Sequence, residues 1–147
     1  MADPTDRPTA LEVLVGEWTV QVPFPGSSIG RVSFEWTLDR RYLLQRSEVP
    51  DSPVPSSLAL FAPDGDGFRQ HYFDSRGVVR LYSMTLRDSV WTMLRTEPDF
   101  SPLDFHQRFV GTFSADGHTV DGRWESSPDG ASWELDFPLT YTRVRAG

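Results

Sequence analysis

The chain has 147 residues, a length typical of one domain, and it contains no cysteine, which excludes disulfides and thiolate metal sites. Its formal net charge of −7 disfavours nucleic acid and membrane surfaces as partners, because both are acidic and repel an acidic protein. No apolar run reaches the roughly 18 residues of a membrane-spanning helix, and the polar start lacks the features of a signal peptide. We expect a cytoplasmic protein in which a flexible segment, residues 1–8, precedes a single β-barrel domain, residues 9–147.

The first element that the sequence predicts is a short helix. Thr9 and Glu12 are spaced as a capping box, in which each side chain bonds a backbone amide at the start of a helix. Leu11 and Leu14 follow at helical spacing, and Gly16 is a typical helix end.

After this helix, alternation of apolar and polar residues predicts about ten strands. The alternation is clearest where Val32, Phe34 and Trp36 occupy every second position. Pro138 lies inside the last apolar run and predicts a bulge or an edge position there. The predicted strands cover residues 18–22, 31–38, 42–49, 58–61, 68–73, 78–86, 90–95, 105–113, 119–125 and 133–144.

Glycine-containing turns separate the strands in the second half of the chain. Glycine accepts a positive φ and aspartate tolerates one, so such turns suit hairpins between antiparallel strands. A long meander of this kind removes its exposed edges by closing. The predicted fold is therefore all-β, a single antiparallel up-and-down β-barrel, and more than about eight strands leave room inside. The turns are Asp64-Gly65-Asp66-Gly67, Ser75-Arg76-Gly77, Asp116-Gly117 and Asp129-Gly130.

Several motifs resemble known barrel proteins. The opening Leu14-Val15-Gly16-Glu17-Trp18 is similar to the Leu-x-Gly-x-Trp opening of calycin-type barrels, in which the tryptophan packs near the barrel base. Further stretches resemble an uncharacterised bacterial family, the DUF1579-like proteins. The resemblance covers nearly the whole chain after Leu11 and implies a barrel like that of lipocalins or fatty-acid-binding proteins, without a catalytic assignment or a ligand. The stretches are 72–82, 109–113, 122–125 and 139–143.

A related calycin group, the nitrobindins, binds haem through a histidine, and this chain departs from their pattern. Their Gly-rich, Pro-containing segment after the opening tryptophan is replaced here by Thr19-Val20-Gln21-Val22. We therefore expect no cofactor. No two of the three histidines have metal-ligand spacing, so we expect no metal site either.

Polar residues that fall in the apolar phase of a strand are candidates for a site, because burial is costly for a polar side chain without a partner. Arg80, Gln107, Tyr72 and Arg46 each share a phase with apolar residues of their predicted strands. With Tyr82, they are predicted to line the interior as ligand-binding residues. An inward arginine suits a carboxylate, which it holds in a bidentate fork. The alternative is that Arg80 pairs with Asp74 or Glu35 and only closes the barrel.

Three functions remain open at this point. The first is a barrel that binds a small apolar or amphipathic molecule, with an acid group recognised by Arg80. The second is a cofactor-free isomerase or cyclase in the same interior, for which the sequence assigns no catalytic residue. The third is a dimeric interaction module with a packed interior and an apolar outer patch.

Overall fold

The computed structural model describes residues 10–22, 29–99 and 103–146, and in these ranges the fold is all-β. The expected N-cap Thr9 and the segment 1–8 lie outside the described residues. No helix in the described ranges is long and apolar enough to cross a membrane. The strands are β1 (Gly16–Gln21), β2 (Gly30–Thr37), β3 (Tyr42–Glu48), β4 (Ser57–Asp64), β5 (Gly67–Asp74), β6 (Val79–Arg87), β7 (Val90–Arg95), β8 (His106–Phe113), β9 (Thr119–Ser127) and β10 (Glu134–Ala146).

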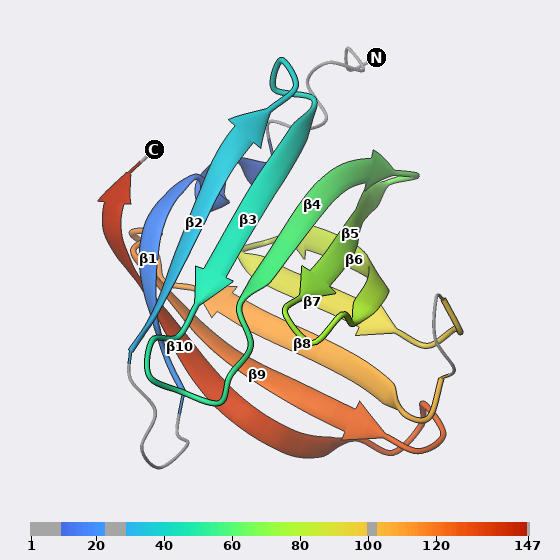
Figure 1. Cartoon of the computed structure of the whole chain (residues 1–147). Helices are drawn as coiled ribbons and strands as arrows, with labels where there is room; N and C mark the ends of the chain where they lie inside the picture. The colour runs from blue at the N-terminus through green and yellow to red at the C-terminus, as the bar shows by residue number, and fades with distance from the viewer. Residues whose placement is uncertain (1–9, 23–28, 100–102, 147) are drawn as a thin grey trace.

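The ten strands close into one barrel in which each strand is antiparallel to the strands before and after it. Closure comes from the first and last strands, where Val20 of β1 pairs with Tyr141 of β10. Figure 1 shows β1 lying beside β10 although they stand at opposite ends of the sequence. The predicted up-and-down barrel is therefore confirmed, together with the strand count.

The predicted turns are also confirmed. Gly65, Gly77, Gly117 and Gly130 all have φ between 59° and 83°, the left-handed region in which a side chain would be strained. Pro138 follows an irregularity in the pairing of β10 with β9, between Leu135 and Phe137, so the predicted bulge is present.

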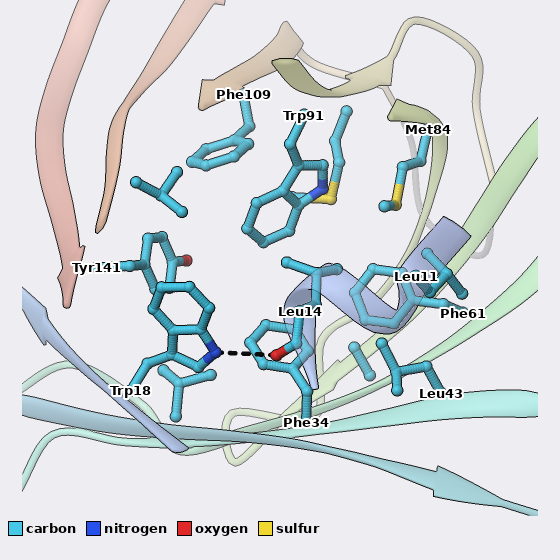
Figure 2. Packing of buried hydrophobic residues seen from close by; sticks show 14 of the residues in the cluster. Leu11, Leu14, Trp18, Phe34, Leu43, Phe61, Met84, Trp91, Phe109 and Tyr141 are labelled. Carbon is cyan, nitrogen blue, oxygen red and sulfur yellow. Dashed lines mark hydrogen bonds between the residues drawn. The ribbon is translucent and has the colours of Figure 1, made fainter. Parts of the chain in front are cut away.

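The expected N-terminal helix is a 3₁₀ turn over residues 10–14 and contains no α-helical residue. Five residues are too few to offset the cost of nucleating an α-helix, whereas 3₁₀ turns are commonly this short. Leu11 and Leu14 are 0% and 1% exposed, so the turn is held by packing. Trp18 fixes it further, because its Nε1 donates a hydrogen bond to the Leu14 carbonyl at 2.9 Å (Figure 2).

The two ends of the barrel differ in the polarity of their inward side chains. At one end, here called the plug end, Leu11 and Leu14 are buried among the inward aromatic residues (Figure 2). The strands of this end are joined by the short connections 38–41, 65–66, 88–89 and 114–118. The opposite end, here called the loop end, has the longer connections 49–56 and 96–105. The polar inward side chains lie toward the loop end.

Candidate functional site

Three of the predicted residues form one hydrogen-bonded group on the inward face, here called the head-group cluster: Arg80, Tyr82 and Gln107. Gln107 Oε1 accepts two hydrogen bonds, from Arg80 Nη1 at 3.2 Å and from Tyr82 Oη at 3.1 Å. Arg80 and Tyr82 are neighbours on the inward face of β6, and Gln107 reaches them from β8. The structure therefore brings together three side chains that the sequence had selected separately.

Arg80 is half-buried and forms no ion pair with any residue that the structure describes. Its side chain donates a hydrogen bond to the neutral amide of Gln107. Burial raises the pKa of Tyr82, and the nearby Arg80 guanidinium opposes that shift only in part. Tyr82 is consequently protonated at neutral pH, and the cluster offers a cation and a hydroxyl donor on the inside of the barrel.

The two carboxylates considered as partners of Arg80 are paired elsewhere. Arg76 binds Asp74, with 2.6 Å between Nη2 and Oδ2. Arg46 lies near Glu35, with 3.7 Å between Nε and Oε1, and both side chains are more than half exposed. The alternative in which Arg80 pairs with Asp74 or Glu35 is therefore wrong for this structure.

Tyr72 lies beside the head-group cluster. It is directly opposite Arg80 in the pairing of β5 with β6, and its ring meets the Tyr82 ring edge-on, with centroids 6.4 Å apart. Its hydroxyl donates to Asp74 Oδ2 at 2.9 Å. Burial and this hydrogen bond both raise the pKa of Tyr72. Tyr72 contributes a wall of the site, whereas its hydroxyl is already occupied by Asp74.

The prediction that Arg46 lines the interior is wrong. Its side chain is 63% exposed on the outer face of β3, and the inward position next to it belongs to Gln45. The register explains this, because inward-facing Phe34 of β2 pairs directly with Gln45. Two consecutive leucines, Leu43 and Leu44, leave the phase of β3 ambiguous in the sequence, and Leu43 is the buried one.

Gln45 and Gln70 form a second polar contact inside the barrel that the sequence analysis did not identify. Gln70 Nε2 donates to Gln45 Oε1 at 3.2 Å, and both residues are buried. Gln70 is directly opposite Tyr82 between β5 and β6, so this amide pair adjoins the head-group cluster. The shared phase of Gln70 and Tyr72 was a usable signal, whereas the phase of Gln45 was obscured by the adjacent leucines.

A continuous line of aromatic rings, here called the aromatic row, runs from the head-group cluster toward the plug end. Its centroids are 5.6 Å apart for Tyr82 and Trp124, 5.3 Å for Trp124 and Phe109, and 4.7 Å for Phe109 and Trp91. Tyr141 continues it, with its ring 5.8 Å from that of Trp91 (Figure 2). The row lines the inside of the barrel with apolar rings and begins at Tyr82, next to the Arg80 guanidinium on β6.

Two glycines determine where one ring of this row lies. Gly111 and Gly122 are directly paired across β8 and β9. A Cβ atom on Gly111 would stand 3.0 Å from Phe109 Cε2, and one on Gly122 would stand 3.0 Å from Phe109 Cε1. The Phe109 ring therefore covers both glycines and lies against the barrel wall.

A buried ion pair stands at the loop end of β7. Arg95 Nε and Asp99 Oδ2 are 2.8 Å apart, with side-chain exposures of 3% and 2%. Asp99 Oδ2 also accepts a hydrogen bond from the Leu81 amide at 2.9 Å, which ties residues 96–99 to β6. Arg95 shares the inward phase of Trp91 and could have been found from it, but Asp99 follows a proline in a loop without periodicity.

The comparisons with known proteins show the fold. No protein-family model matches the sequence, and no curated protein matches it. Among solved structures, the chain is similar to the crystal structure of Rv2717c from M. tuberculosis, with a TM-score of 0.65 and 13% sequence identity. The match covers 99% of this chain and 100% of the other. In the described residues, no group of three or more histidine, aspartate or glutamate side chains could hold a metal ion.

Proposed function

We propose that this barrel binds a small amphipathic carboxylic acid, with the carboxylate at the head-group cluster and the apolar part along the aromatic row. The observation that carries the proposal is Arg80, a half-buried guanidinium on the inward face with no ion pair among the described residues. A charge that leaves water without a counter-charge is costly, and an anionic ligand supplies that counter-charge.

The chemistry of the cluster fits a carboxylate. Arg80 offers a planar set of N–H donors that matches the two oxygens of the ligand. Tyr82 adds a hydroxyl donor, since burial keeps it protonated at neutral pH. In this proposal both groups exchange their hydrogen bonds to Gln107 for bonds to the ligand, and the amide nitrogen of Gln107 then donates to a carboxylate oxygen of the ligand.

The aromatic row suits the apolar part of the ligand. Trp124 packs against Tyr82 at one end of the row, and Phe109 connects it to the buried rings near the plug end. Small-molecule sites are usually mostly apolar, with a few polar groups that fix orientation. A calycin-type barrel of DUF1579-like sequence, acting in the cytoplasm, is the family and compartment that we propose on the sequence motifs.

The test is a calorimetric titration with dodecanoate as the probe. Arg80→Met should weaken dodecanoate binding at least about tenfold, because it removes a charge-assisted contact of about 1.5–3 kcal/mol. Arg87→Met is the matched control, since Arg87 lies on the same strand and is exposed, and it should bind as the wild type does. Arg80→Lys should recover part of the affinity.

Circular dichroism must first show that Arg80→Met keeps the strand content of the wild type. Equal affinity of the wild type, Arg80→Met and Arg87→Met for dodecanoate would overturn the carboxylate site. So would a complete lack of dodecanoate binding by the wild type.

A further inference from the structure

Tyr141 of β10 is a buried tyrosine whose hydroxyl has no hydrogen bond to any residue that the structure describes. The residue is 7% exposed, and burial alone raises its pKa. Its ring is enclosed by Trp18, Trp91 and Phe109, with centroids 6.5, 5.8 and 6.4 Å away. In Figure 2 the hydroxyl points away from β10 into the space between the core side chains.

The Tyr141 hydroxyl oxygen is not among the fully enclosed atoms without a partner, which in the described residues are Trp91 Nε1 and His106 Nδ1, so it keeps some exposed surface in an otherwise buried residue. Tyrosine normally places its hydroxyl on a partner at such a position. Phenylalanine would fill the same space without a polar atom. The hydroxyl therefore indicates a partner that is supplied from outside the chain.

The position of Tyr141 relates this hydroxyl to the head-group cluster. Tyr141 lies on the inward face of β10, two residues after buried Leu139, so both side chains point to the same face of the strand. Three ring contacts join it to Tyr82, through Trp124 and Phe109, at 5.6, 5.3 and 6.4 Å. A ligand that follows the aromatic row from Arg80 toward the plug end meets the Tyr141 hydroxyl partway along its apolar part.

We infer that the ligand is an oxygenated amphipathic acid, with a carboxylate at Arg80 and a hydroxyl or carbonyl oxygen farther along the chain, hydrogen-bonded to Tyr141. This inference rests on the proposed function, because Arg80 sets the orientation of the ligand. A phenol both donates and accepts, so either oxygen type satisfies it. A plain alkyl acid in the same place leaves the hydroxyl unpaired.

Another buried donor nearby does not carry this argument. Trp91 Nε1 is buried and has no hydrogen-bond partner in the described part of the chain. Figure 2 shows its nitrogen on the side of the ring that faces Met84, away from Tyr141. The inference therefore stands on the Tyr141 hydroxyl.

The experiment measures calorimetric affinities for dodecanoate and for a series of hydroxydodecanoates in which the hydroxyl is moved along the chain. With wild-type protein, at least one mid-chain isomer should bind about 3–10-fold more tightly than dodecanoate, the range expected for one net hydrogen bond. Tyr141→Phe should remove this preference, because the phenyl ring keeps the apolar contact but offers no hydroxyl. Tyr42→Phe, which alters an exposed tyrosine of β3, is the matched control and should keep the preference.

Urea unfolding of the ligand-free variants completes the test. Tyr141→Phe should be as stable as the wild type or more so, because it removes a hydroxyl without a partner. A clear loss of stability would show that a fixed water or another group already satisfies the hydroxyl, which overturns the inference.

The other outcomes separate the two proposals. If dodecanoate binds through Arg80 but no hydroxylated isomer binds more tightly, or if the preference survives in Tyr141→Phe, the inference fails and the proposed function stands. If no acid in the series binds to the wild type, both are wrong.

Discussion

The guanidinium of Arg143 lies over the ring of Trp18, with its central carbon 4.1 Å from the ring centroid. Nη2 donates to the carbonyl of Val13, within the 3₁₀ turn, at 2.5 Å. Nη1 donates to the carbonyl of Val15, just after the turn, at 2.6 Å. Arg143 therefore connects the last strand both to the 3₁₀ turn, residues 10–14, and to Trp18 of the first strand. Since Trp18 Nε1 also donates to Leu14, the two side chains hold the turn from both sides.

Arg143→Met should lower the free energy of unfolding by about 2–4 kcal/mol, because it removes the hydrogen bonds from the guanidinium to the Val13, Val15 and Gly117 carbonyls and a cation–π contact. Urea unfolding followed by tryptophan fluorescence measures this. Arg145→Met is the control, since Arg145 is 76% exposed and its Nε comes no closer than 4.0 Å to Glu17 Oε2. That change should stay within about 1 kcal/mol of the wild type. Equal effects of the two substitutions would contradict the role given to Arg143.

The Asp74 carboxylate should make stability depend on pH at the acid end. Burial by itself raises the pKa of Asp74, but hydrogen bonds from Arg76, Tyr72 and the Arg76 and Val78 amides outweigh it and hold the pKa at about 2. A folded-state pKa below the usual value of about 3.9 means that the ionised group stabilises the fold above about pH 4. That contribution is lost as the pH falls from about 4 to about 2.

Asp74→Asn is the variant that isolates this effect, because other carboxylates with lowered pKa, such as Glu125 beside Arg108, remain in both proteins. At pH 6 the variant should be less stable by about 1 kcal/mol, a figure that allows for solvent screening around half-exposed Arg76. The difference should disappear near pH 2. Urea unfolding across this range measures it, and a difference that does not vary with pH would argue against the carboxylate as its source.

Gly122→Ala should displace the Phe109 ring toward the inside of the barrel. The new methyl group would stand 3.0 and 3.1 Å from two ring carbons and 3.4 Å from the Leu139 carbonyl oxygen. We expect a loss of about 1–3 kcal/mol in stability from this overpacking, together with weaker dodecanoate binding. In a Phe109→Leu background the same change should be tolerated better, and the coupling between the two sites measures the contact. If the effects of the two substitutions on the free energy of unfolding simply add, the Phe109 ring is not in close contact with position 122.

The fold was predictable because several local signals agree on it. Alternation fixed the strands to within a few residues, and the Gly65, Gly117 and Gly130 turns indicated antiparallel pairing of successive strands. Closure followed from the need to remove edges. The N-terminal turn was predicted as a helix because capping and spacing describe only local preference, whereas its five residues are held by the burial of Leu11 and Leu14.

The site was predictable only where one strand face is unambiguous. Arg80, Tyr82 and Gln107 were identified correctly as inward-facing neighbours because β6 and β8 alternate cleanly. Arg46 was misplaced because adjacent Leu43 and Leu44 fit either phase, and only pairing with β2 decides between them. The hydrogen bond of Arg80 with Gln107 joins two strands that are separated by β7, so it depends on how the sheet curves and on side-chain conformation rather than on a local sequence pattern.

The Arg95–Asp99 ion pair should be the most sensitive electrostatic contact of the described structure. Asp99→Ala leaves the Arg95 guanidinium buried without its carboxylate and removes the acceptor of the Leu81 amide. We expect a loss of about 3–5 kcal/mol in the free energy of unfolding. Asp64→Ala is the matched control, because Asp64 pairs with Arg69 at 3.1 Å while both side chains are nearly half exposed, and it should cost at most about 1 kcal/mol.

Replacing both members of the buried pair, as in Arg95→Met with Asp99→Leu, should cost less than Asp99→Ala alone. Removing both charges leaves no isolated ion inside the protein, and apolar side chains of similar volume recover packing there. Urea unfolding of Arg95→Met, of Asp99→Leu and of the double variant gives the coupling energy between the two side chains. A double variant that is less stable than Asp99→Ala would show that the Arg95 side chain stabilises the fold mainly through contacts other than its ion pair.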